Sequence, residues 1–170
     1  MIKVEKLYNS KQLLAMKMEY ATLEEHQLKR LNNLFHLKAR RPEPKTVCCV
    51  PEVSIGEGNL VTNYYLDYEV DSFSRIHRDL ENEITAVTLL EKSDDLVGGE
   101  IVLIMPFERK HYEHPFIFDS MGDKKITQGD YAVPVIVPME VGETVLIEGQ
   151  PHGVTKVTKG MRRVHVGWWS

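Results

Sequence analysis

The chain has 170 residues, of which 42% are hydrophobic and 27% charged, a composition that favours one globular domain with its own core. The formal net charge of −4 argues against a nucleic-acid partner, which usually calls for a basic surface. No apolar run has the length of a membrane span, so we expect no membrane partner.

The N-terminus begins MIKVEKLYNSKQLL and shows no apolar run of the kind that forms a signal peptide. The only cysteines, Cys48 and Cys49, are adjacent and therefore poorly placed to close an unstrained disulfide. Reduced thiols are typical of a reducing compartment. We therefore expect a cytoplasmic protein that needs no disulfide.

The first predicted element is a helix over residues 10–39. Ser10 is a candidate N-cap, apolar residues recur at roughly helical spacing, and the prolines of RRPEP would end the helix. An amphipathic helix that buttresses a core is the simpler interpretation, and a partner-binding helix is the alternative. His26 and His36 would lie on its polar side.

Beyond Pro44 the pattern changes to short apolar or alternating runs, separated by turn-like stretches such as GEGN and MGDKK. Many short strands at this spacing are typical of an all-β sandwich or barrel. We expect a single domain over residues 1–170, with a helical N-terminal part (1–44) and a β core (45–170). The predicted strands are TVCCV, NLVTNYYL, EITAVTLL, EIVLIMPF, HPFIF, YAVPVIVP, ETVLIEG, VTKVT and RRVHVGWW.

The stretch SFSRIHRDLENE places His77 and Asp79 two residues apart. In a strand, such residues point to the same face, so this imidazole and this carboxylate are able to hold one ion. The pair alone is a weak signal, because it also occurs by chance on surface strands and loops. Of the other histidines, His152 follows a turn and opens a β run, which makes it the candidate third ligand. His111 and His114 fall in a charged segment typical of an exposed loop.

In the final run, Arg162, Val164, Val166 and Trp168 share one face, and the two valines and the tryptophan mark that face as the interior. Burying a guanidinium there costs free energy unless the group pairs with an anion. The alternation therefore predicts that Arg162 points inward and provides a seat for a carboxylate ligand. Arg163 and His165 are expected to point outward, and Arg163 to have no role in the site.

These residues carry a resemblance to a known family. The pattern His77-x-Asp79, then His152, then an arginine ten residues later resembles the Fe(II)- and 2-oxoglutarate-dependent dioxygenases, most closely the prolyl-4-hydroxylase-like branch. DYEVDSFSRIHRD places Tyr68 nine residues before the first ligand, as in that branch. LLEKSDDLVGGEIVL and VPMEVGETVLIEGQPHGVTKVTKGMRR are similar to the family's strands and glycine turns, so the resemblance covers about residues 60–169.

The resemblance implies a mainly β fold, a double-stranded β-helix or jelly roll, here with an N-terminal buttressing helix. It implies an enzyme that uses Fe(II), dioxygen and 2-oxoglutarate to hydroxylate a C–H bond, with decarboxylation of 2-oxoglutarate to succinate. Ascorbate would be a possible reductant. Protein-linked proline is the first candidate substrate, and a free amino acid, another side chain or a small molecule is the alternative.

The same resemblance assigns roles to particular residues. Two imidazoles and one carboxylate form the facial triad that leaves open positions on Fe(II). Arg162 would bind the far carboxylate of 2-oxoglutarate, Tyr68 would add a hydroxyl contact, and Trp168 would lie near the substrate. The metal ligands, which are also the catalytic residues, would be His77, Asp79 and His152.

The chain departs from the family in two places. Many members carry a tyrosine that contacts the co-substrate in the strand after the motif, where this chain has Leu89; Thr85 or Thr88 could replace its hydroxyl, or Tyr68 could act alone. The branch often has an aromatic residue where this chain has Ser74. Two other functions stay open: a cupin-like module that binds metal or ligand without turnover, and a structural jelly roll in which the three candidate ligands are dispersed.

Overall fold

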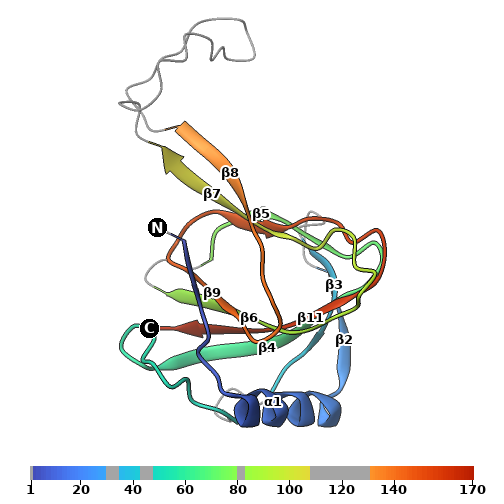
Figure 1. Ribbon diagram of the computed structural model, residues 1–170, viewed down its shortest axis with the longest axis vertical. Helices are drawn as coiled ribbons and strands as arrows, with labels where there is room; N and C mark the ends of the chain where they lie inside the picture. Colours follow the sequence, from blue (N-terminus) through green and yellow to red (C-terminus); the bar gives the residue numbers. More distant parts are fainter. Residues whose placement is uncertain (1, 30–34, 43–47, 80–82, 108–130) are drawn as a thin grey trace, which may run out of the picture.

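The computed structural model describes residues 2–29, 35–42, 48–79, 83–107 and 131–170 (Figure 1). Its elements form an antiparallel sheet covered on one outer face by a helix. In chain order they are β1 (Lys3–Glu5), α1 (Ser10–Thr22), β2 (Glu25–Lys29), β3 (Phe35–Arg40), β4 (Leu60–Tyr68), β5 (Phe73–His77), β6 (Ile84–Lys92), β7 (Ile101–Phe107), β8 (Tyr131–Val137), β9 (Thr144–Ile147), β10 (His152–Val154) and β11 (Arg162–Trp169).

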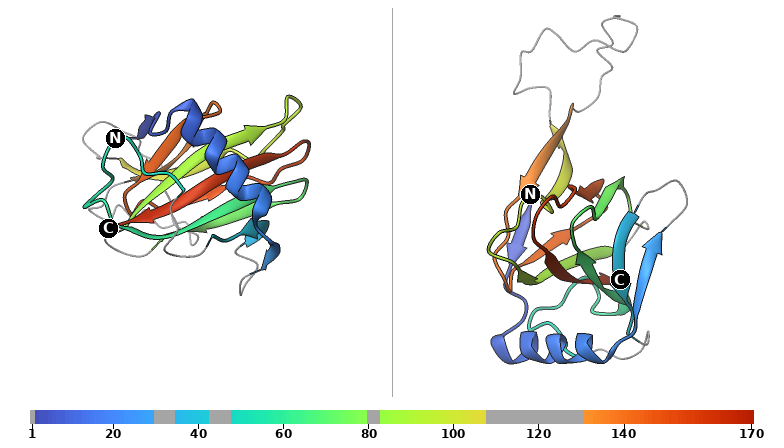
Figure 2. Two further views of the ribbon diagram at one scale, coloured as in Figure 1. Left: turned by 90° about the horizontal axis from the view of Figure 1, so that it is seen from below. Right: turned by 90° about the vertical axis from the view of Figure 1, so that its right-hand side faces the viewer.

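The strands follow the order β1-β9-β6-β11-β4-β3-β5-β10-β7-β8, with β2 paired to β3 at the side. The sheet curls along this path, so that β5 and β10 face β6 and β11 across a cavity lined from both walls (Figures 1 and 2). β7 and β8 extend beyond the curl as a hairpin. The prediction of a mainly β, jelly-roll core is confirmed.

The helix is shorter than the sequence pattern predicted. It covers Ser10–Thr22, and its N-cap is Asn9 rather than Ser10: the Asn9 side chain accepts from the Gln12 backbone N–H, and the Gln12 side chain accepts from the Asn9 backbone N–H. No helix in the described part of the chain has the length and apolar character needed to cross a membrane.

The prediction that the helix continues to residue 39 is wrong, because residues 25–40 supply the strands β2 and β3. β3 pairs with β2 on one side and with β4 and β5 on the other, so it joins the two walls of the curled sheet. Pairing on both sides gives the backbone of β3 hydrogen-bond partners that an isolated extended segment would lack. His26 and His36 therefore lie on strands.

Six of the predicted strands are confirmed, as β4, β6, β7, β8, β9 and β11. The described part of TVCCV, residues 48–50, forms no strand, and HPFIF lies outside the described residues. The strand predicted at VTKVT, residues 154–158, is wrong except at Val154: β10 covers His152–Val154, where it pairs with β5 and β7, and residues 155–158 form no strand.

Two apolar clusters lie on opposite sides of the wall formed by β4, β6 and β11. The inner cluster fills the curl and includes Leu37, Leu103 and Val164. The outer cluster joins α1 to the back of the same strands, through residues such as Met16 and Leu90. The helix therefore buttresses the sheet, and each strand of this wall is buried on both faces.

Candidate active site

The three candidate ligands come from two strands that are neighbours in the sheet but far apart in the chain. His77 ends β5, Asp79 follows it in the adjoining loop, and His152 begins β10. β5 and β10 pair antiparallel with His77 and His152 as partners, and their ring centroids lie 4.5 Å apart. The predicted cluster is brought together, although Asp79 lies just past the strand rather than within it.

Both imidazoles are oriented by backbone carbonyls. His77 Nδ1 lies 2.7 Å from the carbonyl oxygen of Arg75, and His152 Nδ1 lies 3.0 Å from that of Gln150. A carbonyl only accepts, so each Nδ1 carries the proton and each Nε2 presents a lone pair. The Phe35 ring packs edge-on against His77 at 4.9 Å and helps fix that ring. This tautomer is the one that a metal-binding imidazole needs.

Asp79 completes the group. Its Oδ1 lies 3.5 Å from His77 Nε2, and its Oδ2 lies 3.3 Å from His152 Nε2 and 2.5 Å from Thr85 Oγ1. Burial opposes ionisation, but the contacts with His152 and His77 and the hydrogen bond from Thr85 outweigh it and hold the pKa of Asp79 well below its usual range. The carboxylate is therefore charged at neutral pH.

This donor set fits a divalent transition-metal ion. The three ligand atoms lie within 4.8 Å of one another, in the described part of the chain. Nitrogen and oxygen donors bound at about 2.1 Å and at right angles to each other lie about 3 Å apart, close to the His–Asp separations found here. Two neutral imidazoles and one carboxylate match the set that leaves open positions on Fe(II).

Arg162 points into the same cavity, as strand alternation predicted, and is only 5% exposed. Its guanidinium donates to the carbonyl of Gly99 and lies against the sulfur of Met139. Within the described residues no carboxylate lies within ion-pair distance of Arg162, and its Nε has no hydrogen-bond partner. Burial lowers the pKa of Arg162, with only partial compensation from Tyr68 and Glu100. A buried guanidinium in this state favours an anionic ligand.

Tyr68 pairs with Arg162 across the β4–β11 ladder, and its ring centroid lies 5.9 Å from the Arg162 Cζ. Burial raises the pKa of Tyr68 to about 12, so its hydroxyl keeps the proton and is able to donate to an anion in the cavity. Thr88 points elsewhere, because its Oγ1 lies 2.8 Å from that of Thr144 in the buried interior. Thr85 lines the cavity but is engaged by Asp79.

The cavity that holds these groups has a volume of about 330 Å³. Its walls are mostly apolar, with Leu37, Val87 and Val166 among them, as is typical of a small-molecule pocket. Trp168 lines it at the far end of β11 from Arg162, where its ring packs edge-on against Tyr64 at 5.9 Å. The residues predicted from the sequence therefore face one cavity.

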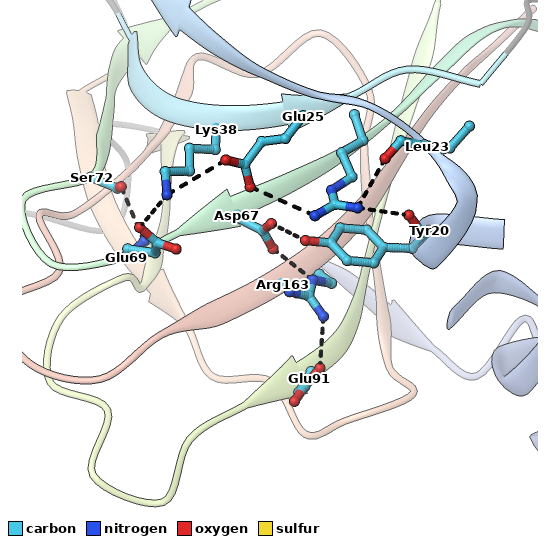
Figure 3. Close-up of polar contacts among 10 residues, drawn as sticks. Tyr20, Leu23, Glu25, Lys38, Asp67, Glu69, Ser72, Glu91 and Arg163 are labelled. Atoms are coloured by element: carbon cyan, nitrogen blue, oxygen red, sulfur yellow. Dashed lines mark hydrogen bonds and ion pairs between the residues drawn. The ribbon is translucent and has the colours of Figure 1, made fainter. Parts of the chain in front are cut away.

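Arg163, on the opposite face of β11, has a different environment from the one expected. It points outward from the cavity but toward α1, where its Nε lies 2.6 Å from Asp67 Oδ1 and its Nη1 3.0 Å from Glu91 Oε2 (Figure 3). The Tyr20 hydroxyl also donates to Asp67. Burial opposes the charge of Arg163, but Asp67 outweighs it and raises the pKa of Arg163. Arg163 therefore has a role in the fold that strand alternation did not predict, because Asp67 is 3% exposed and needs this partner.

Sequence reasoning missed two contributors to the site, Phe35 and the carbonyls that orient the imidazoles, and it gave Thr85 a contact with the co-substrate rather than with Asp79. The alternation of Phe35, Leu37 and Ala39 with polar residues was a visible signal for an inward-facing strand, but no local pattern marks Thr85 as a partner of Asp79. His165 points away from the cavity, as alternation predicted, and it is buried on the other face against Tyr65. His111 and His114 lie outside the described residues.

No protein-family model and no curated protein matches the sequence. Solved structures do share the fold. An oxidoreductase of the 2OG-Fe(II) oxygenase family from Burkholderia pseudomallei is 16% identical with a TM-score of 0.65, over 96% of this chain and 81% of that one. A Pseudomonas putida prolyl-4-hydroxylase is 15% identical with a TM-score of 0.59, over 98% and 90% of the two chains. HygX from Streptomyces hygroscopicus, with nickel, 2-oxoglutarate and hygromycin B bound, is 13% identical with a TM-score of 0.51, over 98% and 81%.

At these identities the likeness concerns the fold alone. It agrees with the resemblance found in the sequence, because the structures that match include 2OG-Fe(II) oxygenases and a prolyl-4-hydroxylase. The chain has the jelly-roll fold of the 2OG-Fe(II) oxygenases.

Proposed function

We propose that this protein is an Fe(II)- and 2-oxoglutarate-dependent dioxygenase that hydroxylates a C–H bond. One observation carries the proposal: a group of two histidines and one aspartate faces the same cavity as a buried arginine without a carboxylate partner among the described residues. In this assignment His77, Asp79 and His152 bind the metal. Arg162 binds the far carboxylate of 2-oxoglutarate, and Tyr68 donates to it.

The assigned residues supply binding and orientation. The Fe(II) with dioxygen and 2-oxoglutarate supplies the oxidation, in which one oxygen atom goes to the substrate carbon and the other to succinate, with release of CO₂. The backbone carbonyls of Arg75 and Gln150 hold the two imidazoles in the metal-binding tautomer. The fork of Arg162 is suited to a bidentate pair with a carboxylate, and the apolar walls exclude water from it.

The inward arginine favours this function over a metal- or ligand-binding module without turnover, because simple metal binding does not require a second, buried anion seat. The substrate is less constrained. The likeness to a prolyl-4-hydroxylase supports a prolyl residue, and the hygromycin B bound to HygX supports a small molecule. Ascorbate is the reductant we would include in assays.

The test combines metal binding with co-substrate turnover. Under anaerobic conditions the protein should bind one Fe(II), and on admission of air it should convert 2-oxoglutarate to succinate and CO₂. Asp79→Ala should abolish both, because it removes the only charged ligand. Asp94→Ala, at an exposed aspartate of the loop after β6, should change neither and serves as the matched control.

Three results would contradict the proposal. Metal retention by Asp79→Ala equal to that of the wild type would show that the ion binds elsewhere. Metal binding without 2-oxoglutarate consumption across a panel of peptides and metabolites would favour the non-catalytic module. Turnover that persists when Fe(II) is chelated would remove the metal from the reaction.

A further inference from the structure

The cavity has a second end, away from Arg162. β4 and β11 pair along the cavity wall. Arg162 is the partner of Tyr68 at one end of this ladder, and Val166 is the partner of Tyr64 near the other end. Arg40 pairs with Tyr65 across β3 and β4, so the next residue, Arg41, lies beside Tyr64. Arg41 and Tyr64 both line the cavity, as do His26 and Trp168.

These four side chains form a mouth that is rich in hydrogen-bond donors. The Arg41 Cζ lies 5.2 Å from the ring centroid of Tyr64, a cation–π distance, and Tyr64 in turn packs edge-on against Trp168. The aromatic pair thus holds an exposed guanidinium at the cavity entrance. Within the described residues, no polar side-chain group of Arg41, Tyr64, Trp168 or His26 makes a hydrogen bond or ion pair.

The cavity lining is also unbalanced in charge. Among the described residues that line it, the only carboxylate is Asp79, which two histidines and Thr85 already engage. The cations are Arg162 at the closed end and Arg41 at the mouth. A cleft lined by one sign of charge with apolar walls concentrates ligands of the opposite sign. Donors without acceptors at the mouth favour an anion there as well.

We propose that Arg41 binds a carboxylate of the substrate, and that the substrate is a small carboxylic acid such as a free amino acid or the C-terminal end of a peptide. The inference rests on the proposed function, since it takes the closed end to be filled by 2-oxoglutarate. Arg41 offers the planar fork that pairs with a carboxylate. Tyr64 and Trp168 provide the apolar surface beside it, and the metal group lines the same cavity.

The test measures binding with no chemistry. The protein is loaded with Zn(II) and saturating 2-oxoglutarate, and saturation-transfer NMR and calorimetry are used to screen free amino acids, each paired with its primary amide. Proline with prolinamide, and a proline-ended peptide with free or amidated C-terminus, are included. We expect at least one acid to bind and its amide to bind roughly tenfold or more weakly, because the amide loses a charge-assisted hydrogen bond.

Variants assign the effect to Arg41. Arg41→Gln should bring the acid down to the affinity of its amide, and Arg41→Lys should fall between, since lysine keeps the charge but loses the fork. Lys17→Gln, the same change of charge on the exposed side of α1, should leave both affinities unchanged. The 2-oxoglutarate concentration for half-maximal decarboxylation should stay the same in Arg41→Gln.

The inference is overturned if no acid of the panel binds, if amides bind as well as acids, or if Arg41→Gln weakens both equally. It is also overturned if Arg41→Gln raises the 2-oxoglutarate requirement, because Arg41 would then serve the co-substrate. In each of these cases Fe(II) binding and 2-oxoglutarate consumption by the wild type can still support the proposed function. Loss of those two activities would instead refute the proposed function, whatever the panel shows.

Discussion

Arg162 and Arg163 are neighbours in the chain, but their guanidinium groups lie on opposite faces of β11 in different surroundings. Arg162 faces the cavity, without a carboxylate partner among the described residues, and burial lowers its pKa. Arg163 faces α1, pairs with Asp67 and Glu91, and has a raised pKa. The outer charge is satisfied within the fold, whereas the inner charge is left for a ligand. One strand thus carries a structural arginine and a binding arginine side by side.

The largest effect should come from the inner arginine. Arg162→Ala should raise the 2-oxoglutarate concentration for half-maximal decarboxylation steeply, because truncating one partner of a buried charge pair costs about 2–5 kcal/mol. Iron affinity should change little, since Arg162 is not a ligand. Steady-state kinetics and anaerobic Fe(II) titration measure the two quantities. A variant with normal co-substrate affinity would remove Arg162 from the site.

The outer arginine should affect stability instead. Arg163→Ala leaves the buried carboxylate of Asp67 with only the Tyr20 hydroxyl, and the unfolding free energy should fall by about 3 kcal/mol. Adding Asp67→Asn should restore part of the loss, since the unpaired charge is then absent. Urea unfolding measures both variants. If Arg163→Ala were as stable as the wild type, the contrast between the two faces would fail.

The outer face should also show a pH dependence of the unfolding free energy, through the buried His165. Burial lowers the pKa of His165 to about 4, below the value near 6.5 of an exposed histidine. Between these values the unfolded chain binds a proton that the folded chain does not, so stability falls as the pH falls. The contribution of His165 should be complete above pH 6.5 and reduced by about 2 kcal/mol at pH 5. Urea unfolding of His165→Gln should lose this part of the slope; an unchanged slope would contradict it.

The smallest effect should come from the tyrosine that supports Asp67. Tyr20→Phe removes one hydrogen bond to the carboxylate but keeps the ring under Arg163, so stability should fall by about 1 kcal/mol. Tyr8→Phe is the matched control, because Tyr8 is buried in the same cluster and its hydroxyl makes no hydrogen bond to a described residue. Equal losses in the two variants would mean that the hydrogen bond to Asp67 contributes little.

The inner half of this contrast could be predicted from the sequence. Val164, Val166 and Trp168 alternate with polar or small residues, and strand periodicity alone then places Arg162 in the interior. The three candidate ligands were found by spacing and resemblance. Their meeting at one point depends on pairing between β5 and β10, which no local pattern encodes.

The outer half could not be predicted in the same way. Alternation shows that Arg163 and His165 leave the cavity, but it does not show that α1 covers that face and buries them partly or fully. The predicted helix is longer than the observed one. Leucines continue at helical spacing into residues 25–40, but tertiary pairing makes that region into strands. In that region Phe35, Leu37 and Ala39 alternate with period two, a signal that competed with the helical count.

The pairing of His77 with His152 also has a consequence for how the chain folds. The two residues are partners in the β5–β10 ladder and are 75 positions apart (152 − 77) in the sequence. Closing a loop of this length costs conformational entropy before any contact stabilises the pair, and such pairings are therefore slow to form. An ion that binds only the paired state would add stability at this late step, by about 2.7 kcal/mol when it is present at a hundred times its dissociation constant. Metal supply would then set how much of the newly made chain completes its fold, in addition to how much of it is active.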